Sequence, residues 1–305
     1  MNSPTAALEF VAASKWYGQV SALIDISVRF APGVTGLVGQ NGAGKTTMMK
    51  LACGLLRPSY GTVSLMGQSP TSPQARRHLG YCPDIDKYYE DQSGHKFVTW
   101  MLRLSGDSAR VAAGRATELL EELDLREAMH RRIAGYSKGM RQRVKLAIAL
   151  GHDPSVLLLD EPLTGLDPLG RQEMLELMRR LGSQGVVVIV SSHVLHELQS
   201  VADQVILVHQ GRLLAEGSVA DIREQIYDRP RKILLTSDAP RELAGRLFEQ
   251  ASIVDVKITD RGVEISTQGG NGVNEFITDL GVAGHVQEVL PLDNSLESVF
   301  GYLVK

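Results

Sequence analysis

A short segment early in the chain has the residue types and spacing of a phosphate-binding loop. Residues 39–47 read GQNGAGKTT, which matches the pattern G-x-x-x-x-G-K-[S/T] in full. The glycines let the backbone approach phosphate oxygens, and a helix beginning here would direct unpaired N–H groups at the anion. Lys45 is then placed to reach the β- and γ-phosphates of a nucleotide, and Thr46 to offer its hydroxyl to Mg²⁺. The predicted phosphate-binding residues are Gly39, Gln40, Asn41, Gly42, Ala43, Gly44, Lys45, Thr46 and Thr47.

Two adjacent acids follow a short apolar run in the second half of the chain. Val156–Leu159 is followed directly by Asp160 and Glu161. Two acids at the end of a buried strand are costly as structure alone, and that end of a doubly wound sheet faces the ligand crevice. We therefore expect Asp160 to hold Mg²⁺, through water, and Glu161 to accept a proton from an attacking water as general base. The alternative is a solvated strand end without chemistry.

The elements that must position these residues alternate between strand and helix patterns. Apolar runs predict buried strands, amphipathic stretches predict helices, and their alternation favours a parallel or mixed sheet with helices on its faces. Before the acids we expect a strand at Val34–Val38 and a helix at Thr46–Leu56; after them, strands at Val156–Asp160 and Val186–Ser191 with a helix at Leu169–Leu181 between them.

The composition of the chain changes after its first two thirds. A helical stretch runs from about Gly94 to Leu150, and Val205–His209 with the turn after it predicts a hairpin. The linker expected at Tyr227–Arg231 is followed by a βαββαβ order and a last helix at Leu296–Leu303, a plausible ferredoxin-like unit.

Composition excludes several classes of protein. The chain has 305 residues, a net charge of −3 and two cysteines, which cannot make a disulfide framework. We expect both cysteines to be inert, small apolar residues. No apolar run approaches the roughly 20 residues of a membrane-spanning helix, and no signal peptide is expected. The charge balance gives no electrostatic reason to bind nucleic acid.

With these motifs, the chain resembles the ATP-binding subunit of an ABC transporter over about residues 6–225. Tyr136–Arg143, reading YSKGMRQR, resembles the signature of that family, although its commonest form has Gly at position 138 and Gln at position 140. The version here is similar to an exporter-like branch. The resemblance implies that Ser137 and Gly139 bind the γ-phosphate of a nucleotide held by a second subunit.

Three further residues take their expected roles from this resemblance. Asp167, in the sequence GLDP, resembles the loop that links the two sites of a dimer. His193 resembles the switch histidine that contacts the γ-phosphate. Tyr17 resembles the aromatic residue that stacks on adenine, with Trp16 as a neighbouring rival for that role and core packing as the alternative.

The chain departs from the family pattern at Asp84. Most members carry Gln there, which senses Mg²⁺ and faces the membrane subunit. A carboxylate can still ligate a hard cation, so Asp84 is retained as a candidate metal ligand. By the same resemblance, Ile85–Gly94 would lie at the transmembrane partner.

The resemblance implies an α/β P-loop ABC cassette over residues 6–227, with a mixed or parallel sheet and a helical subdomain at about 84–150. A small α+β ferredoxin-like domain follows at 232–305. The implied function is Mg-ATP hydrolysis by a homodimer, coupled to export through separate transmembrane permease subunits, on the cytoplasmic face of the cell membrane and without nucleic acid. The implied cofactors are ATP and Mg²⁺.

Several alternatives remain open at this point. The cassette could serve an importer, or a soluble ATPase acting on nucleic acid, although one phosphate loop and a short helical insertion disfavour the latter. The C-terminal domain, with Ser295–Phe300 resembling the end of the small domain in exporter-like cassettes, is expected to dimerise or regulate rather than to catalyse. We do not expect His193 and His196 to form a metal pair, because further zinc ligands are missing nearby.

Overall fold

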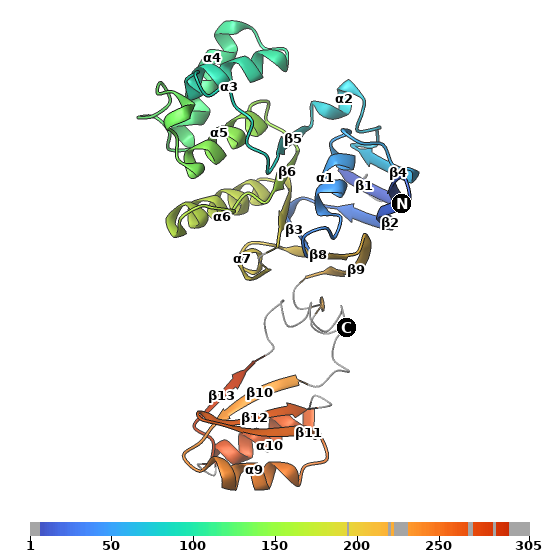
Figure 1. Cartoon of the computed structure of the whole chain (residues 1–305), viewed down its shortest axis with the longest axis vertical. Helices are drawn as coiled ribbons and strands as arrows, with labels where there is room; N and C mark the ends of the chain where they lie inside the picture. The colour runs from blue at the N-terminus through green and yellow to red at the C-terminus, as the bar shows by residue number, and fades with distance from the viewer. Residues whose placement is uncertain are drawn as a thin grey trace. The chain divides into compact units, whose positions relative to one another are not determined.

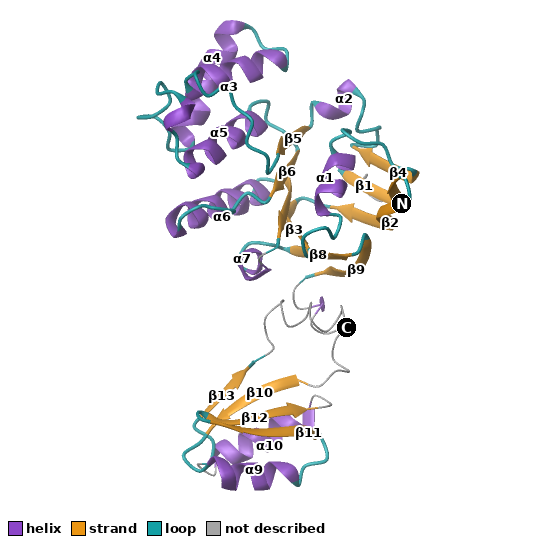
Figure 2. Cartoon of the chain, viewed as in Figure 1, coloured by secondary structure: helices purple, strands orange, loops and turns teal. Residues whose placement is uncertain are grey.

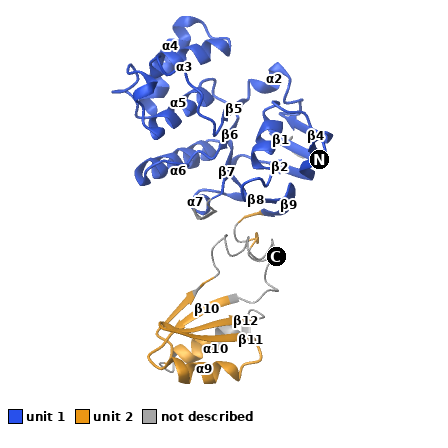
Figure 3. Cartoon of the chain, viewed as in Figure 1, with its two compact units in different colours: residues 1–216 blue, residues 217–305 orange. Residues whose placement is uncertain are grey.

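The computed structural model divides the chain into two compact units, residues 1–216 and 217–305 (Figure 3). It describes residues 7–193, 195–218, 221–222, 231–267, 271–282 and 285–292. Each unit has a hydrophobic core built from its own residues. Most of the predicted linker at 227–231, the side chain of His196, and the predicted last helix with residues 295–300 lie outside the described residues.

A six-stranded sheet forms the centre of the first unit. Its strands stand in the order β5-β6-β7-β3-β8-β9, and the ladders from β5 to β8 are parallel. Strands β6 and β7 are buried along their whole length, as their Val-, Leu- and Ile-rich sequences require of a sheet covered on both faces. The strands are β3 (Gly33–Val38), β5 (Leu79–Cys82), β6 (Val156–Asp160), β7 (Val187–Ser192), β8 (Gln204–His209) and β9 (Arg212–Gly217).

A separate three-stranded antiparallel sheet lies beside the central one in the first unit. Its order is β2-β1-β4, with β1 (Leu8–Tyr17), β2 (Val20–Phe30) and β4 (Tyr60–Leu65). Helix α1 (Lys45–Ala52) packs against β2, β4 and β6, so it is held between the two sheets (Figure 1). This packing fixes the helix whose first turn carries the candidate phosphate loop.

The remaining helices of the first unit fall into two groups. Helix α6 (Pro168–Ser183) packs on β3 and β7, whereas α3, α4 and α5 contact one another as a helical group, of which α5 also packs on β5 (Figure 2). Serine side chains accept a hydrogen bond from the first turn of each of these three helices and so define where it begins. Besides α1 and α6, the helices described in the first unit are α2 (Pro73–Arg76), α3 (Gly94–Leu104), α4 (Ala109–Glu122), the 3₁₀ turn η1 (Ile133–Gly135), α5 (Lys138–Leu150) and α7 (Leu195–Gln199).

The second unit is a four-stranded antiparallel sheet with two helices packed on it. The strand order is β11-β12-β10-β13, and α9 contacts β11 and β12. Buried Leu, Val and Ile side chains from the sheet and both helices fill the space between them. The elements follow a βαββαβ order: β10 (Arg231–Thr236), α9 (Pro240–Phe248), β11 (Ile253–Thr259), β12 (Gly262–Thr267), α10 (Asn271–Val282) and β13 (Glu288–Pro291).

The predicted α/β class, with a mixed sheet core and helices on its faces, is confirmed. The prediction of a helix from Thr46 to Leu56 is wrong at its end, because α1 stops at Ala52. Gly54 follows with φ of 69°, and its N–H donates to the carbonyl of Leu51, which is the geometry of a glycine-terminated helix. In the described part of the chain, no helix is long and apolar enough to cross a membrane.

Candidate functional site

The predicted phosphate loop lies between the end of β3 and the start of α1. Gly44 is the N-cap residue of α1 and has φ of 113°, a conformation that favours glycine. A Cβ at Gly44 would come within 2.7 Å of Leu23 Cδ2 and 2.8 Å of the carbonyl oxygen of Ala22. The backbone can therefore turn into the helix here only without a side chain, which leaves the first N–H groups of α1 at the loop.

Lys45 is the first residue of α1, and its side chain is buried. Its exposed fraction is 6%, and Nζ donates to the carbonyl oxygen of Gly39 at 2.7 Å. Nζ also lies 3.5 Å from Glu161 Oε1. The ammonium group therefore lies inside the curve of the loop and in contact with one of the two acids that follow β6.

The hydroxyl of Thr46, in the first turn of α1, contacts the carboxylate of Asp160 at the end of β6. Thr46 Oγ1 donates to Asp160 Oδ1 at 3.5 Å, and Ser191 Oγ donates to the same oxygen at 2.7 Å. Asp160 is 2% exposed. Ser191 stands opposite it in the parallel ladder between β6 and β7.

Burial raises the pKa of Asp160 above its ordinary value. The hydrogen bonds from Ser191 and Thr46 act in the other direction, while the charges of Asp84 and Glu161 raise the pKa further. A buried carboxylate beside other acids is stabilised in its charged form by a cation, and oxygen donors suit a hard divalent ion. Thr46 and Asp160 thus fit Mg²⁺ chemically. The described residues contain no group of three or more His, Cys, Asp or Glu that could hold a metal.

Glu161 is held by contacts to both of its carboxylate oxygens. His193 Nδ1 lies 2.8 Å from Oε2, and Thr164 Oγ1 donates to Oε2 at 3.4 Å, opposite the contact of Lys45 with Oε1. The backbone of Glu161 has φ of 50°, in the left-handed region that non-glycine residues rarely adopt. Strain of this kind costs about 1–3 kcal/mol and clusters at functional sites.

Ser191 is the residue of this group that the sequence patterns did not single out. Besides its bond to Asp160, its Oγ accepts from the backbone N–H of Glu161 at 2.9 Å. One feature of the sequence could have identified Ser191: it is a hydroxyl residue at the end of an apolar run. A strand buried on both faces ordinarily carries hydrophobic side chains. Only the pairing of β6 with β7 reveals what the hydroxyl contacts.

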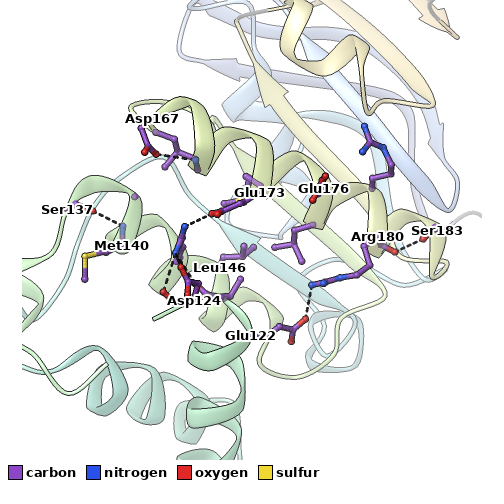
Figure 4. A pocket seen from close by; sticks show the side chains of 18 residues that line it. Glu122, Asp124, Ser137, Met140, Leu146, Asp167, Glu173, Glu176, Arg180 and Ser183 are labelled. Carbon is purple, nitrogen blue, oxygen red and sulfur yellow. Dashed lines mark hydrogen bonds and ion pairs between the residues drawn. The ribbon is translucent and has the colours of Figure 1, made fainter. Parts of the chain in front are cut away.

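Ser137, Gly139 and Asp167 lie together at a different place from the phosphate loop. All three line a cavity of about 830 Å³ between α5 and α6 (Figure 4). The loop residues 39–47, Asp160, Glu161 and His193 are not among those lining it. The structure therefore brings the predicted residues together in two groups. The first group is Lys45, Thr46, Asp160, Glu161 and His193, and the second group is Ser137, Gly139 and Asp167.

Both of the polar residues in the second group cap a helix. Ser137 Oγ accepts from Met140 N at 3.2 Å at the start of α5, and Asp167 Oδ1 accepts from Gly170 N at 3.1 Å at the start of α6. Two helix N-termini, each with a positive dipole end, thus border the same cavity.

Ion pairs join the two helices that border this cavity. Arg143 on α5 donates to Glu173 on α6 at 2.5 Å and to Asp124 at 3.1 Å, and Arg180 on α6 contacts Glu122 on α4 at 2.8 Å (Figure 4). These contacts hold the helical group against α6.

The last two predicted residues, Tyr17 and Asp84, are both exposed. Tyr17 ends β1 and is 48% exposed, with Lys15 Nζ 5.5 Å from its ring centroid; Trp16 is 41% exposed. Asp84 is exposed just after β5, and its charge acts on Asp160. Its backbone oxygen accepts from Lys145 Nζ at 3.4 Å.

Comparisons with known proteins show which family this chain resembles in sequence and fold. The family model described as ABC transporter matches residues 23–164, which include the phosphate loop, Ser137 and both acids. YxlF of Bacillus subtilis (strain 168), an uncharacterized ABC transporter ATP-binding protein, is 43% identical over 189 residues, 62% of this chain. The matched part is 63% of that relative's own length, so this chain spans less than two thirds of it.

Two further comparisons extend the similarity. The Nod factor export ATP-binding protein I of Burkholderia orbicola (strain AU 1054) is 36% identical over 216 residues, covering 70% of this chain and 71% of that protein. A solved structure of the ATP binding subunit of an ABC transporter is 30% identical, with a TM-score of 0.66, over 72% of this chain and 93% of its own.

Proposed function

This chain belongs to the ABC transporter family of ATP-binding proteins, and from that premise we propose that it binds and hydrolyses Mg-ATP to drive export through separate membrane subunits. The observation that carries the proposal is the contact set around Glu161. Lys45 reaches one of its oxygens and His193 the other, while Asp160 and Thr46 meet beside it.

Each residue of the first group has a separate proposed role in ATP hydrolysis. Lys45 and the N–H groups at the start of α1 bind the β- and γ-phosphates. Asp160 and Thr46 would hold Mg²⁺, which would supply positive charge to offset that of the phosphates. Glu161 accepts a proton from the attacking water at one of its carboxylate oxygens, a role typically worth about 10²–10⁴ in rate. His193 orients that carboxylate and contacts the γ-phosphate, and Tyr17 stacks on the adenine.

The second group is proposed to act on a nucleotide held by another copy of the chain. Ser137 and Gly139 stand at the start of α5, on a cavity that the phosphate loop does not line. A helix N-terminus with a serine and a glycine binds an anion readily. In a homodimer each site would then combine Lys45, Asp160 and Glu161 of one copy with Ser137 and Gly139 of the other. Asp167, beside that cavity, would link the two sites.

The partners are proposed from the same premise. The name of the Burkholderia relative assigns that protein to export, which supports an export role here. A membrane permease would be a separate protein that contacts the surface after β5, around Asp84. We place the chain on the cytoplasmic face of the membrane, with the cassette at 6–227 and an accessory domain at 232–305.

Hydrolysis by the purified chain, measured beside the size of the protein with and without Mg-ATP, tests the proposal. Glu161→Gln should lower kcat by at least about 10²-fold while an ATP-dependent dimer accumulates, because binding survives and proton transfer does not. Glu127→Gln, a change of the same type at an exposed position, is the control and should match the parent. Parent-like hydrolysis by Glu161→Gln would reject Glu161 as the base, and absence of nucleotide binding by the parent would reject the function.

A further inference from the structure

A single hydroxyl connects both acids after β6 to the end of β7. Ser191 Oγ donates its proton to Asp160 Oδ1 at 2.7 Å and accepts from the backbone N–H of Glu161 at 2.9 Å. Ser191 has an exposed fraction of 0%. A serine hydroxyl has one proton and two lone pairs. The single proton of Ser191 is therefore used in the bond to Asp160, and a lone pair accepts the N–H of Glu161.

The bond to Asp160 fixes the orientation of its carboxylate. Thr46 and Ser191 both donate to Oδ1, so this oxygen is held from two sides. A carboxylate held in this way has little freedom to rotate about its last bond, and partners of this kind orient the groups that bind a metal.

The bond to Glu161 acts on the backbone instead of the side chain. Glu161 has φ of 50°, and the N–H of this unusual conformation is satisfied by Ser191. The backbone conformation in turn determines where the side chain of Glu161 leaves the chain, toward Lys45 and His193. His193 lies two residues after Ser191, so the end of β7 holds Glu161 at both its backbone and its carboxylate.

We propose that Ser191 is a positioning residue of the ATPase site, which orients Asp160 toward the metal and fixes the backbone of Glu161 so that its carboxylate faces the attacking water. This inference rests on the proposed function. The strand β7 is apolar as far as Val190 and ends in two buried serines, of which Ser191 contacts both acids.

The test compares the full-length chain with Ser191→Ala, which removes the hydroxyl, and Ser191→Thr, which keeps it. Affinity for a fluorescent ATP analogue is measured in EDTA and across a Mg²⁺ titration, and kcat and KM are measured beside it. Ser191→Ala should raise the Mg²⁺ concentration at half-saturation and lower kcat, each by about tenfold or more. Its affinity in EDTA should stay within about twofold of the parent, and Ser191→Thr should restore both values.

A matched control is Thr35→Val, which removes a buried hydroxyl from β3, the neighbour of β7 in the sheet. Parent-like Mg²⁺ dependence and kcat in Ser191→Ala, or an equal loss in Thr35→Val, would overturn the inference. If Ser191→Ala does not fold, Ser191→Cys takes its place, because it replaces the hydroxyl by a weak donor. The same losses in Mg²⁺ dependence and kcat are then expected, and parent-like values would overturn the inference. A parent chain that binds no nucleotide would reject the proposed function itself, and the inference with it.

Discussion

Glu161 lies where the ends of two strands and the start of a helix meet. Lys45 comes from α1, His193 follows β7, and Glu161 itself follows β6. The side chain of Glu161 is 15% exposed, so water reaches it while its neighbours restrict its rotation. A general base needs both access to water and a fixed direction.

The contact of His193 with Glu161 predicts a specific effect on the rate. His193→Ala should lower kcat by about 10²-fold and leave KM nearly unchanged, because Glu161 Oε2 loses the nearer of its two partners while the proposed phosphate contact of Lys45 remains. Steady-state kinetics measures the two constants separately. His130→Ala, an exposed histidine on the helical group, is the control. A large rise in KM at constant kcat would show that His193 acts mainly through its proposed contact with the γ-phosphate and not by orienting Glu161.

At this scale the sequence predicted the residue types but not all of their contacts. Lys45, Asp160 and Glu161 were identified because a phosphate loop and a paired acid after an apolar run are local patterns. Ser191 was not identified, because its partners are 31 and 30 residues away and depend on the register between β6 and β7.

At the scale of elements, we expect the turn from β3 into α1 to tolerate a side chain less well at Gly44 than at Gly42. Gly44→Ala should lower the free energy of unfolding by about 1–3 kcal/mol more than Gly42→Ala, because its Cβ would lie 2.7 Å from Leu23. Gly42 has φ of 82° but open space around it, so it controls for backbone strain alone. Urea unfolding of the two variants measures the difference. Equal values would show that strain, and not the close approach, decides the cost.

The start of α5 allows the capping role of Ser137 to be separated from its proposed role toward phosphate. Ser137→Asp should keep the urea midpoint of the parent, since Asp caps a helix as well as Ser. It should nevertheless abolish ATP-dependent dimerisation and hydrolysis, because a carboxylate repels the γ-phosphate. Ser108→Asp makes the same change at the start of α4 and should affect neither. Retained dimerisation in Ser137→Asp would contradict the proposed role.

Helices with clear end signals were predicted well from the sequence. The helical stretch predicted from about Gly94 to Leu150 begins and ends at those residues in the structure, with α3 starting at Gly94 and α5 ending at Leu150. The one predicted at Thr46–Leu56 ends four residues early, because Gly54 was taken as part of the helix. Strand β5 was missed because it has only four residues, too few for a pattern to show.

At the scale of the whole molecule, the second unit carries a core of its own. Residues 217–305 expressed alone should unfold cooperatively on heating, because the buried Leu, Val and Ile side chains between sheet and helices all belong to this unit. Calorimetry or circular dichroism measures the transition. A fragment that shows no cooperative transition would mean that the unit depends on the rest of the chain for stability.

The left-handed backbone of Glu161 has a consequence for how this protein would evolve in the laboratory. Glycine or asparagine would occupy the same backbone conformation with less strain. A library selected only for heat resistance should therefore accumulate such replacements at this position and yield robust chains that no longer turn over substrate. Selection for growth that requires turnover should restore glutamate at this position. Comparing the stability of the chains from the two selections would measure how much stability the protein loses by keeping glutamate there.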